Sequence, residues 1–203
     1  MRFYYHFGEQ QIVLEVSDDV YYPREDSVFM ADFLVDFLSK RRMKPKRILD
    51  VGTGSGFLAI LCFLLTGAKV TAVDINRKAV ECARKNAARN RCRLILIESD
   101  LFEGIRGKYD LVLFNPPYLP PSPESDKHLG TAKKALTESG EIPRFLLKLS
   151  GHLTSDGIAL LLASSLTPVD MEKLSQRNKL KAMVIQTKKL DWEELMLYKI
   201  TSL

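Results

Sequence analysis

The sequence contains three cysteines, and no two of them have the C-x-x-C spacing of a metal or redox motif. Because Cys62, Cys82 and Cys92 are odd in number and irregularly spaced, they predict neither a disulfide framework nor a zinc site. Free thiols persist in a reducing compartment, and we expect the protein to be cytoplasmic.

Long apolar runs are also lacking. No run approaches the roughly 20 residues that a membrane-spanning helix needs. The first residues, Met1–His6, lack the apolar core of a signal peptide. Internal repeats are absent, and the one compositionally biased stretch is proline-rich, at 116–123. We therefore expect no membrane partner and one domain over residues 1–203.

The charge balance is moderately basic, with a formal net charge of +5 and a pI near 9.0. Basic residues cluster at 40–47, 84–93 and 188–189. Such clusters are typical of solvated helix ends, because cations are favourable near a helix C-terminus. They also fit attraction to an RNA-rich partner. The clusters lack the interleaved aromatic residues of a base-stacking surface, which favours the first interpretation and leaves nucleic acid as a secondary possibility.

Apolar runs and amphipathic stretches alternate along the chain. The first 22 residues predict a short extended segment, and the apolar spacing from Phe29 to Leu38 predicts a helix whose start Asp26 or Ser27 can cap. Seven later runs are typical of strands: 47–51, 69–74, 93–97, 110–114, 158–163, 182–186 and 195–200. Helical patterns lie between most of them, at 56–66, 77–90, 142–151 and 169–179.

The strand-like segments are continuous apolar runs, which indicates parallel strands covered on both faces. The connector between the last two, 187–194, is shorter than the crossover that parallel neighbours require. We therefore expect an α/β fold with a seven-stranded, mostly parallel sheet, one antiparallel strand near its C-terminus, and helices on both faces.

The tetrad Asn115-Pro116-Pro117-Tyr118 directly follows the apolar run 110–114. Two prolines forbid continuation of the strand, so Asn115 is predicted to lie at the carboxyl edge of the sheet, where open α/β sheets bind ligands. Its carboxamide oxygen and a nearby backbone carbonyl can accept both hydrogens of a planar –NH2 group, on which Tyr118 can stack. This arrangement indicates methylation of an amide or an aromatic amine, whose nitrogen is poorly nucleophilic.

Residues 48–56 are predicted to form a strand, a glycine turn and the start of a helix. Gly52 and Gly54 belong to a G-x-G-x-G spacing that allows positive φ and a close approach of the backbone to a ligand. Phe57 stands where a dinucleotide fold would have a third glycine, which disfavours a pyrophosphate ligand. A ligand without phosphates can use the same turn, with Asp50 facing a cationic amino group.

Acidic residues end the next two predicted strands. Asp74 suits two ribose hydroxyls, and Asp100 can accept a hydrogen bond from an adenine amine while Leu101 packs on the ring. Alone, Asp74 is also consistent with a helix N-cap, and Asp100 with an ordinary loop acid. The set matches S-adenosyl-L-methionine, which has an amino acid, a ribose and an adenine, whereas NAD(H) accounts only for the acid at the ribose.

With these motifs, the chain resembles the class I S-adenosylmethionine-dependent methyltransferases, and within them the HemK-like protein-glutamine methyltransferases. The stretch Val20–Ser27 reads V-Y-Y-P-R-E-D-S and resembles the V-Y-x-P-x-E-D-[ST] signature of the short archaeal and eukaryotic members. The resemblance implies a Rossmann-like class I methyltransferase domain over 1–203, with an N-terminal extension and helix at 1–45 and a catalytic core at 46–203.

The resemblance also implies an activity. The expected substrate is the glutamine side-chain amide in the Gly-Gly-Gln motif of a class I peptide chain release factor. The residues implied to contact the cofactor are Ser27, Asp50, Gly52, Gly54, Asp74, Asp100, Leu101 and Asn115. A catalytic role is implied for Asn115, Pro116, Pro117 and Tyr118, and no metal is implied.

A small zinc-binding activator subunit is the further partner that the resemblance implies. It would pair with an edge strand of the sheet at Arg93–Ile97, whose apolar residues are a liability unless something covers them. One departure concerns 135–140, which reads A-L-T-E-S-G where relatives carry a glycine-rich stretch. We expect that segment to shape the target pocket, so the difference affects the prediction of the substrate and not the prediction of methyl transfer.

Two other functions remain open at this point. An adenine-N6 methyltransferase acting on RNA or DNA would use the same tetrad, because the exocyclic amine of adenine is also planar. A non-catalytic, cofactor-binding scaffold is the second alternative, and the intact tetrad and the three acids argue against it.

Overall fold

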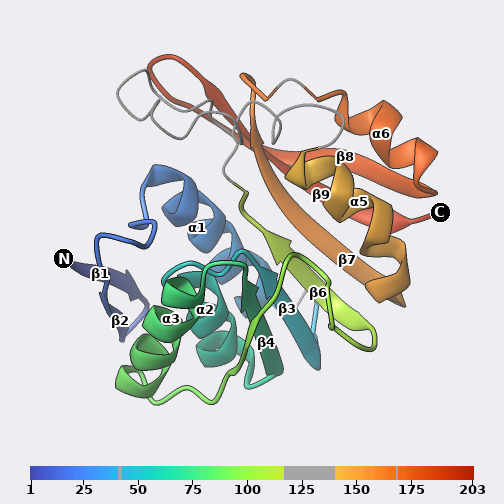
Figure 1. Ribbon diagram of the computed structural model, residues 1–203. Helices are drawn as coiled ribbons and strands as arrows, with labels where there is room; N and C mark the ends of the chain where they lie inside the picture. Colours follow the sequence, from blue (N-terminus) through green and yellow to red (C-terminus); the bar gives the residue numbers. More distant parts are fainter. Residues whose placement is uncertain (41–42, 117–139, 168) are drawn as a thin grey trace.

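The computed structural model describes residues 1–40, 43–116, 140–167 and 169–203 (Figure 1). The strands are β1 (Arg2–Phe7), β2 (Gln10–Glu15), β3 (Arg47–Val51), β4 (Lys69–Asp74), β5 (Ile95–Glu98), β6 (Tyr109–Phe114), β7 (Leu153–Ser164), β8 (Leu180–Lys189) and β9 (Glu194–Ser202). The helices are α1 (Glu25–Ser39), α2 (Phe57–Thr66), α3 (Arg77–Arg89), α5 (Glu141–His152) and α6 (Met171–Arg177).

Seven strands form the central sheet, in the order β5-β4-β3-β6-β7-β9-β8. The strands from β5 to β7 are parallel to their neighbours, whereas β9 runs antiparallel to both β7 and β8. The predicted α/β architecture, with one antiparallel strand near the C-terminus, is confirmed. The third predicted strand, Arg93–Ile97, is shifted in the structure: β5 covers Ile95–Glu98.

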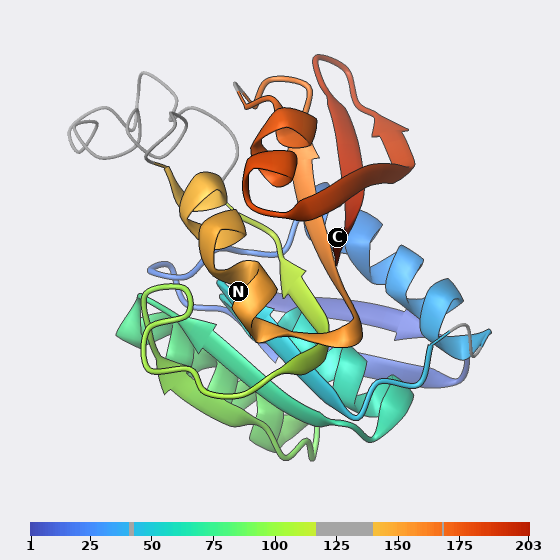
Figure 2. The same ribbon diagram turned by 90° about the vertical axis from the view of Figure 1, so that its right-hand side faces the viewer.

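Helices cover both faces of this sheet, which gives three layers (Figures 1 and 2). On one face, α1, α2 and α3 pack with the β1–β2 hairpin over apolar residues such as Ile48, Val70 and Leu111. On the other face, α5 and α6 pack over Leu49, Val112 and their neighbours. Successive strand residues point to opposite faces, so continuous apolar runs fill both layers.

The N-terminal segment is a β-hairpin, not a single extended stretch. Strands β1 and β2 pair in antiparallel register over all of Arg2–Phe7. The outer edge of β2 is bound by α3, since Asn86 Oδ1 accepts from the Glu15 N–H at 2.9 Å and Asn90 Oδ1 from the Val13 N–H at 3.0 Å. These contacts fix the hairpin to the helical layer.

The predicted cap of the first helix is wrong. Helix α1 begins after Arg24, which makes no side-chain capping bond, and both Asp26 and Ser27 are buried inside its first turn. Their side chains hydrogen-bond to Asn115, so they are not available to cap the helix. Within the described residues, no helix is both long and apolar enough to cross a membrane.

Candidate active site

A cleft of about 430 Å³ opens at the carboxyl ends of β3, β4, β5 and β6, with the first turns of α1 and α5 as its walls. The predicted site residues that line it are Ser27, Asp50, Gly52, Gly54, Asp74, Asp100, Leu101, Asn115 and Pro116. Pro117 and Tyr118 lie outside the described residues. Parallel strands place their carboxyl ends together, which explains why residues so far apart in the sequence meet here.

The glycine turn after β3 forms the floor of the cleft. Gly52, Gly54 and Gly56 have φ of +67°, +54° and +84°, which only glycine adopts without strain. Helix α2 starts at the end of this turn, with Gly56 as its N-cap residue. The Thr53 N–H donates to the Val73 carbonyl at 2.9 Å, so the turn is fixed to the neighbouring strand.

Asp50 lies beneath this turn and is 2% exposed. Its Oδ2 accepts a hydrogen bond from the Thr53 hydroxyl at 2.6 Å. Burial raises the pKa of Asp50 to about 7, although the Thr53 hydroxyl opposes the shift and the nearby Asp74 carboxylate adds to it. A cationic ligand group in the cleft would favour the ionised form.

Asp74 ends β4, and both of its carboxylate oxygens are already oriented by the backbone. Oδ2 accepts from the Gly54 N–H at 2.9 Å and Oδ1 from the Asn76 N–H at 2.9 Å. The N-cap of α3 is Asn76, whose side chain accepts from the Lys78 N–H, so Asp74 is not the cap. Each oxygen of a carboxylate has a second lone pair, which leaves Asp74 able to accept two hydroxyl groups.

Asp100 follows β5 and forms an ion pair with Arg144 of α5, Oδ2 to Nη2 at 2.6 Å. Leu101 next to it has φ +52°, an uncommon value for a residue with a side chain, and lines the same part of the cleft. Glu141 is on the first turn of α5, and its pKa is raised by burial and by the Asp100 carboxylate. This corner is therefore acidic but partly neutralised.

Asn115 is fixed by residues of α1. Its Nδ2 donates to Asp26 Oδ2 at 3.0 Å and lies 3.3 Å from Ser27 Oγ. The other oxygen of Asp26 accepts from the Tyr21 hydroxyl at 3.2 Å. Because the carboxamide nitrogen is held by these acceptors, the orientation of the group is set: nitrogen toward α1, oxygen away from it.

The oxygen of this carboxamide is the notable atom of the site. Asn115 Oδ1 is buried and has no hydrogen-bond partner among the described residues. Buried polar atoms are almost always satisfied, and a buried acceptor without a partner is costly, at about 1–3 kcal/mol. The geometry therefore presents a fixed acceptor to a ligand that brings an N–H donor into the cleft.

Comparison with known proteins assigns the family. The family model described as methyltransferase small domain matches residues 29–169, which is more than half of the 203 residues. The chain belongs to this family. It is a class I methyltransferase, and its methyl donor is S-adenosyl-L-methionine.

Curated relatives agree with this assignment. The methyltransferase is 38% identical over 193 residues to a provisionally named protein N5-glutamine methyltransferase from Methanocaldococcus jannaschii, covering 91% of this chain and 93% of the relative. It is 38% identical over 99 residues to the release factor glutamine methyltransferase of Deinococcus radiodurans, covering 48% of this chain and 35% of that longer relative.

Solved structures share the fold. The methyltransferase is similar to the E. cuniculi Mtq2-Trm112 complex, named for methylation of the eRF1 translation termination factor, with a TM-score of 0.66 and 23% identity over 91% of this chain and 99% of the other. A methyltransferase from Pyrococcus furiosus gives a TM-score of 0.61 with 19% identity, over 91% and 89% of the two chains. At these identities, the likeness establishes the fold.

The residues of the cleft fit this cofactor. Among the described residues that line the cleft are the carboxylates of Asp26, Asp50, Asp74, Asp100 and Glu141 and one cation, Arg144. The cofactor carries a sulfonium, an amino group, two ribose hydroxyls and an adenine amine, which are positive or hydrogen-bond donating. The volume lies within the roughly 300–1,000 Å³ of small-molecule sites.

The sequence did not predict three residues of the methyltransferase cleft: Asp26 as the holder of Asn115, and Glu141 and Arg144 beside Asp100. The signal for Asp26 was its place in the motif Val20–Ser27, beside the predicted Ser27. No sequence signal marked Glu141 or Arg144, because both are on an ordinary amphipathic helix.

Proposed function

We propose that this methyltransferase acts on the side-chain amide nitrogen of the glutamine in the Gly-Gly-Gln motif of a class I peptide chain release factor. The observation that carries the proposal is the buried Asn115 oxygen, which has no partner within the described part of the chain. Relatives named as protein N5-glutamine and release factor glutamine methyltransferases support an amide as the acceptor. A substrate of translation would place the enzyme in the cytoplasm.

An amide is a difficult nucleophile because its nitrogen lone pair is delocalised into the carbonyl. The residues proposed to act on it are Asn115, Pro116, Pro117 and Tyr118. Asn115 Oδ1 would accept one hydrogen of the –NH2 group, and a backbone carbonyl of the tetrad would accept the other. Holding the nitrogen in line with the methyl group can supply about 7–11 kcal/mol of the barrier through orientation alone.

When bound, S-adenosyl-L-methionine would supply the methyl group as an electrophile on its sulfonium. The proposed cofactor contacts come from Ser27, Asp50, Gly52, Gly54, Asp74, Asp100, Leu101 and Asn115. In this assignment Asp50 faces the amino group, Asp74 the ribose hydroxyls, and Asp100 the adenine amine.

No residue is assigned as a general base. After the methyl transfer, the alkylated nitrogen loses a proton readily, so the reaction does not require a base of tuned pKa. The described histidines, His6 and His152, do not line the cleft. His152 stacks on Phe102 and lies 3.3 Å from the Gly107 carbonyl, which makes it part of the packing. His128 lies outside the described residues.

We also propose that a small activator subunit, of the zinc-binding kind implied by the family resemblance, pairs with β5. Strand β5 is an edge of the sheet, and Ile95 on it is 39% exposed. The E. cuniculi relative is named as a complex with Trm112, which supports a partner of this kind. Pairing would cover the apolar edge strand and satisfy its free backbone groups.

The test is transfer of a tritiated methyl group from the cofactor to a purified release factor, with mass spectrometry of the labelled peptide. Asn115→Ala should reduce turnover by at least 100-fold while cofactor affinity, measured by calorimetry, changes far less, because the variant loses the acceptor and leaves the carboxylates in place. Asn178→Ala, at the end of α6, is the matched control and should be fully active.

The same experiment discriminates between the candidate substrates. Label in the Gly-Gly-Gln peptide supports the proposal, whereas label in RNA or DNA would assign an adenine amine as the acceptor. Near-normal turnover of Asn115→Ala would overturn the assignment of the tetrad.

A further inference from the structure

The β8–β9 hairpin extends past the carboxyl edge of the sheet, on the side where the cleft opens. Phe114 is level with Leu161 of β7, which pairs with Tyr198 of β9. From Tyr198, β9 runs outward to Glu194, whose partner is Lys189. These four steps, at about 3.3 Å per residue, place the turn at 190–193 roughly 13 Å beyond the level of Phe114.

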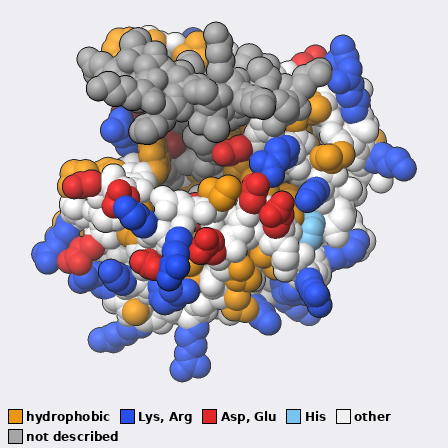
Figure 3. Space-filling model, viewed as in Figure 1, with side chains coloured by type: hydrophobic (Ala, Val, Ile, Leu, Met, Phe, Trp, Pro, Cys, Tyr) orange, Lys and Arg blue, Asp and Glu red, His pale blue; other side chains and the backbone are white. Residues whose placement is uncertain are grey.

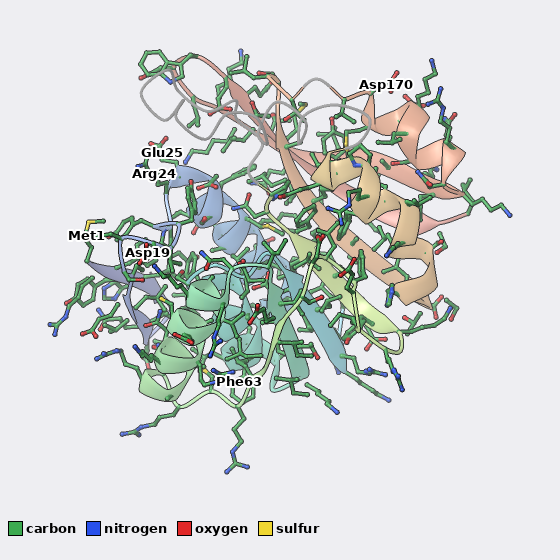
Figure 4. The ribbon with its side chains drawn as sticks, in the orientation of Figure 1. Met1, Asp19, Arg24, Glu25, Phe63 and Asp170 are labelled. Atoms are coloured by element: carbon green, nitrogen blue, oxygen red, sulfur yellow. The ribbon has the colours of Figure 1, made fainter. Side chains whose placement is uncertain are left out.

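The two ribbon views agree on where this turn lies. In Figures 1 and 2 the tip of the red hairpin stands above the N-terminal end of α1. Figure 4 labels Arg24 and Glu25 at that end of α1, below the hairpin. The turn therefore rises beside the mouth of the cleft, which is walled by the first turn of α1.

Trp192 is on this turn and is 83% exposed. It is the one tryptophan of the chain. The turn that carries it is braced, since the Leu190 N–H donates to the Glu193 carbonyl at 2.8 Å. Ser165, after β7, makes two hydrogen bonds to Glu194: its N–H donates to the Glu194 carbonyl at 2.8 Å, and its Oγ accepts from the Glu194 N–H at 3.0 Å. An apolar ring is thus presented to solvent on a fixed support.

A second exposed aromatic ring lies at the cleft itself. Tyr21 lines the cleft and is 55% exposed. Burial of its phenol, followed by the Asp26 carboxylate, raises the pKa of Tyr21, and Glu193 adds to the same shift. Glu193 Oε2 is buried without a hydrogen-bond partner among the described residues. The strand register and the ribbon views place the turn on the side of the sheet where the cleft opens.

We propose that the β8–β9 turn is the docking element for the polypeptide that carries the acceptor amide, with Trp192 as its anchor. This inference rests on the proposed function and adds the surface that selects the substrate. An exposed tryptophan on a rigid support is the type of residue that dominates protein–protein binding energy, and its rigidity lowers the entropic cost of binding.

The chemistry of the turn favours a protein over a nucleic acid. Segment 188–194 contains Lys188 and Lys189 against Asp191, Glu193 and Glu194, so its carboxylates outnumber its cations. The segment is therefore not a net basic patch, which is what sequence-independent binding of nucleic acid requires. On the face seen in Figure 3, acidic side chains are interspersed with lysines and arginines. Because the turn lies roughly 13 Å beyond the level of Phe114, a folded domain bound to it would have room to extend one loop into the cleft and present its amide there.

The test compares the wild type with Trp192→Ala on a folded release factor and on a short Gly-Gly-Gln peptide. We expect KM for the folded protein to rise by about 10- to 30-fold, while kcat, cofactor affinity and activity on the peptide stay unchanged. Met183→Ala is the matched control, because Met183 is on the same hairpin, is 53% exposed, and pairs with Lys199 below the carboxyl edge. Its kinetics should equal those of the wild type.

A second measurement needs no variant. Because Trp192 is the sole tryptophan, its emission should shift to shorter wavelength when a tryptophan-free release factor domain binds. An unchanged KM in Trp192→Ala with an unshifted emission would overturn the docking role, as would a loss of kcat or of cofactor affinity at constant KM. Failure of the wild type to label any release factor would instead refute the proposed function. RNA labelling that depends on Trp192 would indicate that the turn stacks on bases and would refute a polypeptide as its binding partner.

Discussion

At the scale of the residue, Asp50 and Asn115 each lack a different polar partner within the same cleft. Asp50 is a buried acid with a single side-chain donor, Thr53, so burial disfavours its charge. The nitrogen of Asn115 is satisfied by Asp26, and its oxygen has no partner in the described part of the chain. Both groups lack what the ligands of a methyltransferase supply, namely a cation and an N–H donor.

The titration of Asp50 predicts a pH dependence of stability. Its folded-state pKa of about 7 lies above the ordinary value of 3.8, so the folded state binds more protons than the unfolded state between these values. Stability due to Asp50 should be highest below about pH 4 and should fall as the pH rises to about 7, by up to about 4 kcal/mol. Urea unfolding of the wild type and of Asp50→Asn across this range measures the effect.

The difference between the two proteins isolates Asp50, because other titrating groups contribute equally to both. Added S-adenosyl-L-methionine should flatten the slope of the wild type, since a cation near Asp50 favours the carboxylate. Parallel pH profiles for the two proteins would contradict the raised pKa.

At the scale of the element, the glycine turn contacts both the ligand cleft and helix α3. Gly54 has open space around the position of a Cβ, whereas a Cβ on Gly56 would lie 3.0 Å from Ala83 Cβ and 3.1 Å from Ala83 Cα. Gly56 therefore lets α2 begin in contact with α3. The third glycine of the turn has a packing role, and the first two face the ligand cleft.

Two alanine substitutions separate these roles. Gly54→Ala should cost about 1–2 kcal/mol of stability from the left-handed backbone alone. Gly56→Ala should cost about 1–3 kcal/mol more, because backbone atoms of α3 must also move. Denaturant midpoints of the two variants give the comparison, and equal losses would show that the contact with Ala83 is unimportant.

The elements of the sheet were predictable from local patterns, and the links between them were less so. Continuous apolar runs gave the strands of the main sheet, and the short connector 187–194 gave the direction of β9. The position of Asn115 at the end of its strand was predictable because two prolines follow it in the sequence. Asp26 was not, since its bond to Asn115 joins residues 89 positions apart and no periodicity encodes such a contact. The Arg144–Asp100 ion pair was missed for the same reason.

At the scale of the whole molecule, the seven-stranded sheet has two edges of different character. Strand β5 is short and apolar, whereas β8 carries Lys181, Lys188 and Lys189, which discourage pairing with another strand. We propose that residues 1–203 act as one methyltransferase domain whose activator covers β5 and whose substrate meets the β8–β9 turn at the other end. The two proteins could then bind at the same time.

The edge substitution Ile95→Lys tests this division. A charge on β5 should abolish co-purification with a co-expressed Trm112-type subunit, because the strand could no longer be covered by apolar groups. The stability of the isolated chain should change by about 0.5 kcal/mol or less, since Ile95 is a partly exposed side chain. Met183→Lys on β8 is the matched control and should retain the subunit. Equal retention by both variants would refute pairing at β5.

Asn115 Oδ1, which has no hydrogen-bond partner among the described residues, has a consequence for directed evolution of the protein. An apolar side chain at this position alone would leave the buried Asp26 carboxylate without its Asn115 donor, whereas apolar side chains at both positions would remove the two polar groups together and should make the protein harder to unfold. A mutant library screened only for heat resistance would therefore enrich paired replacements of Asn115 and Asp26 and lose the acceptor proposed for turnover. Screening for robustness and for turnover must be combined to keep it.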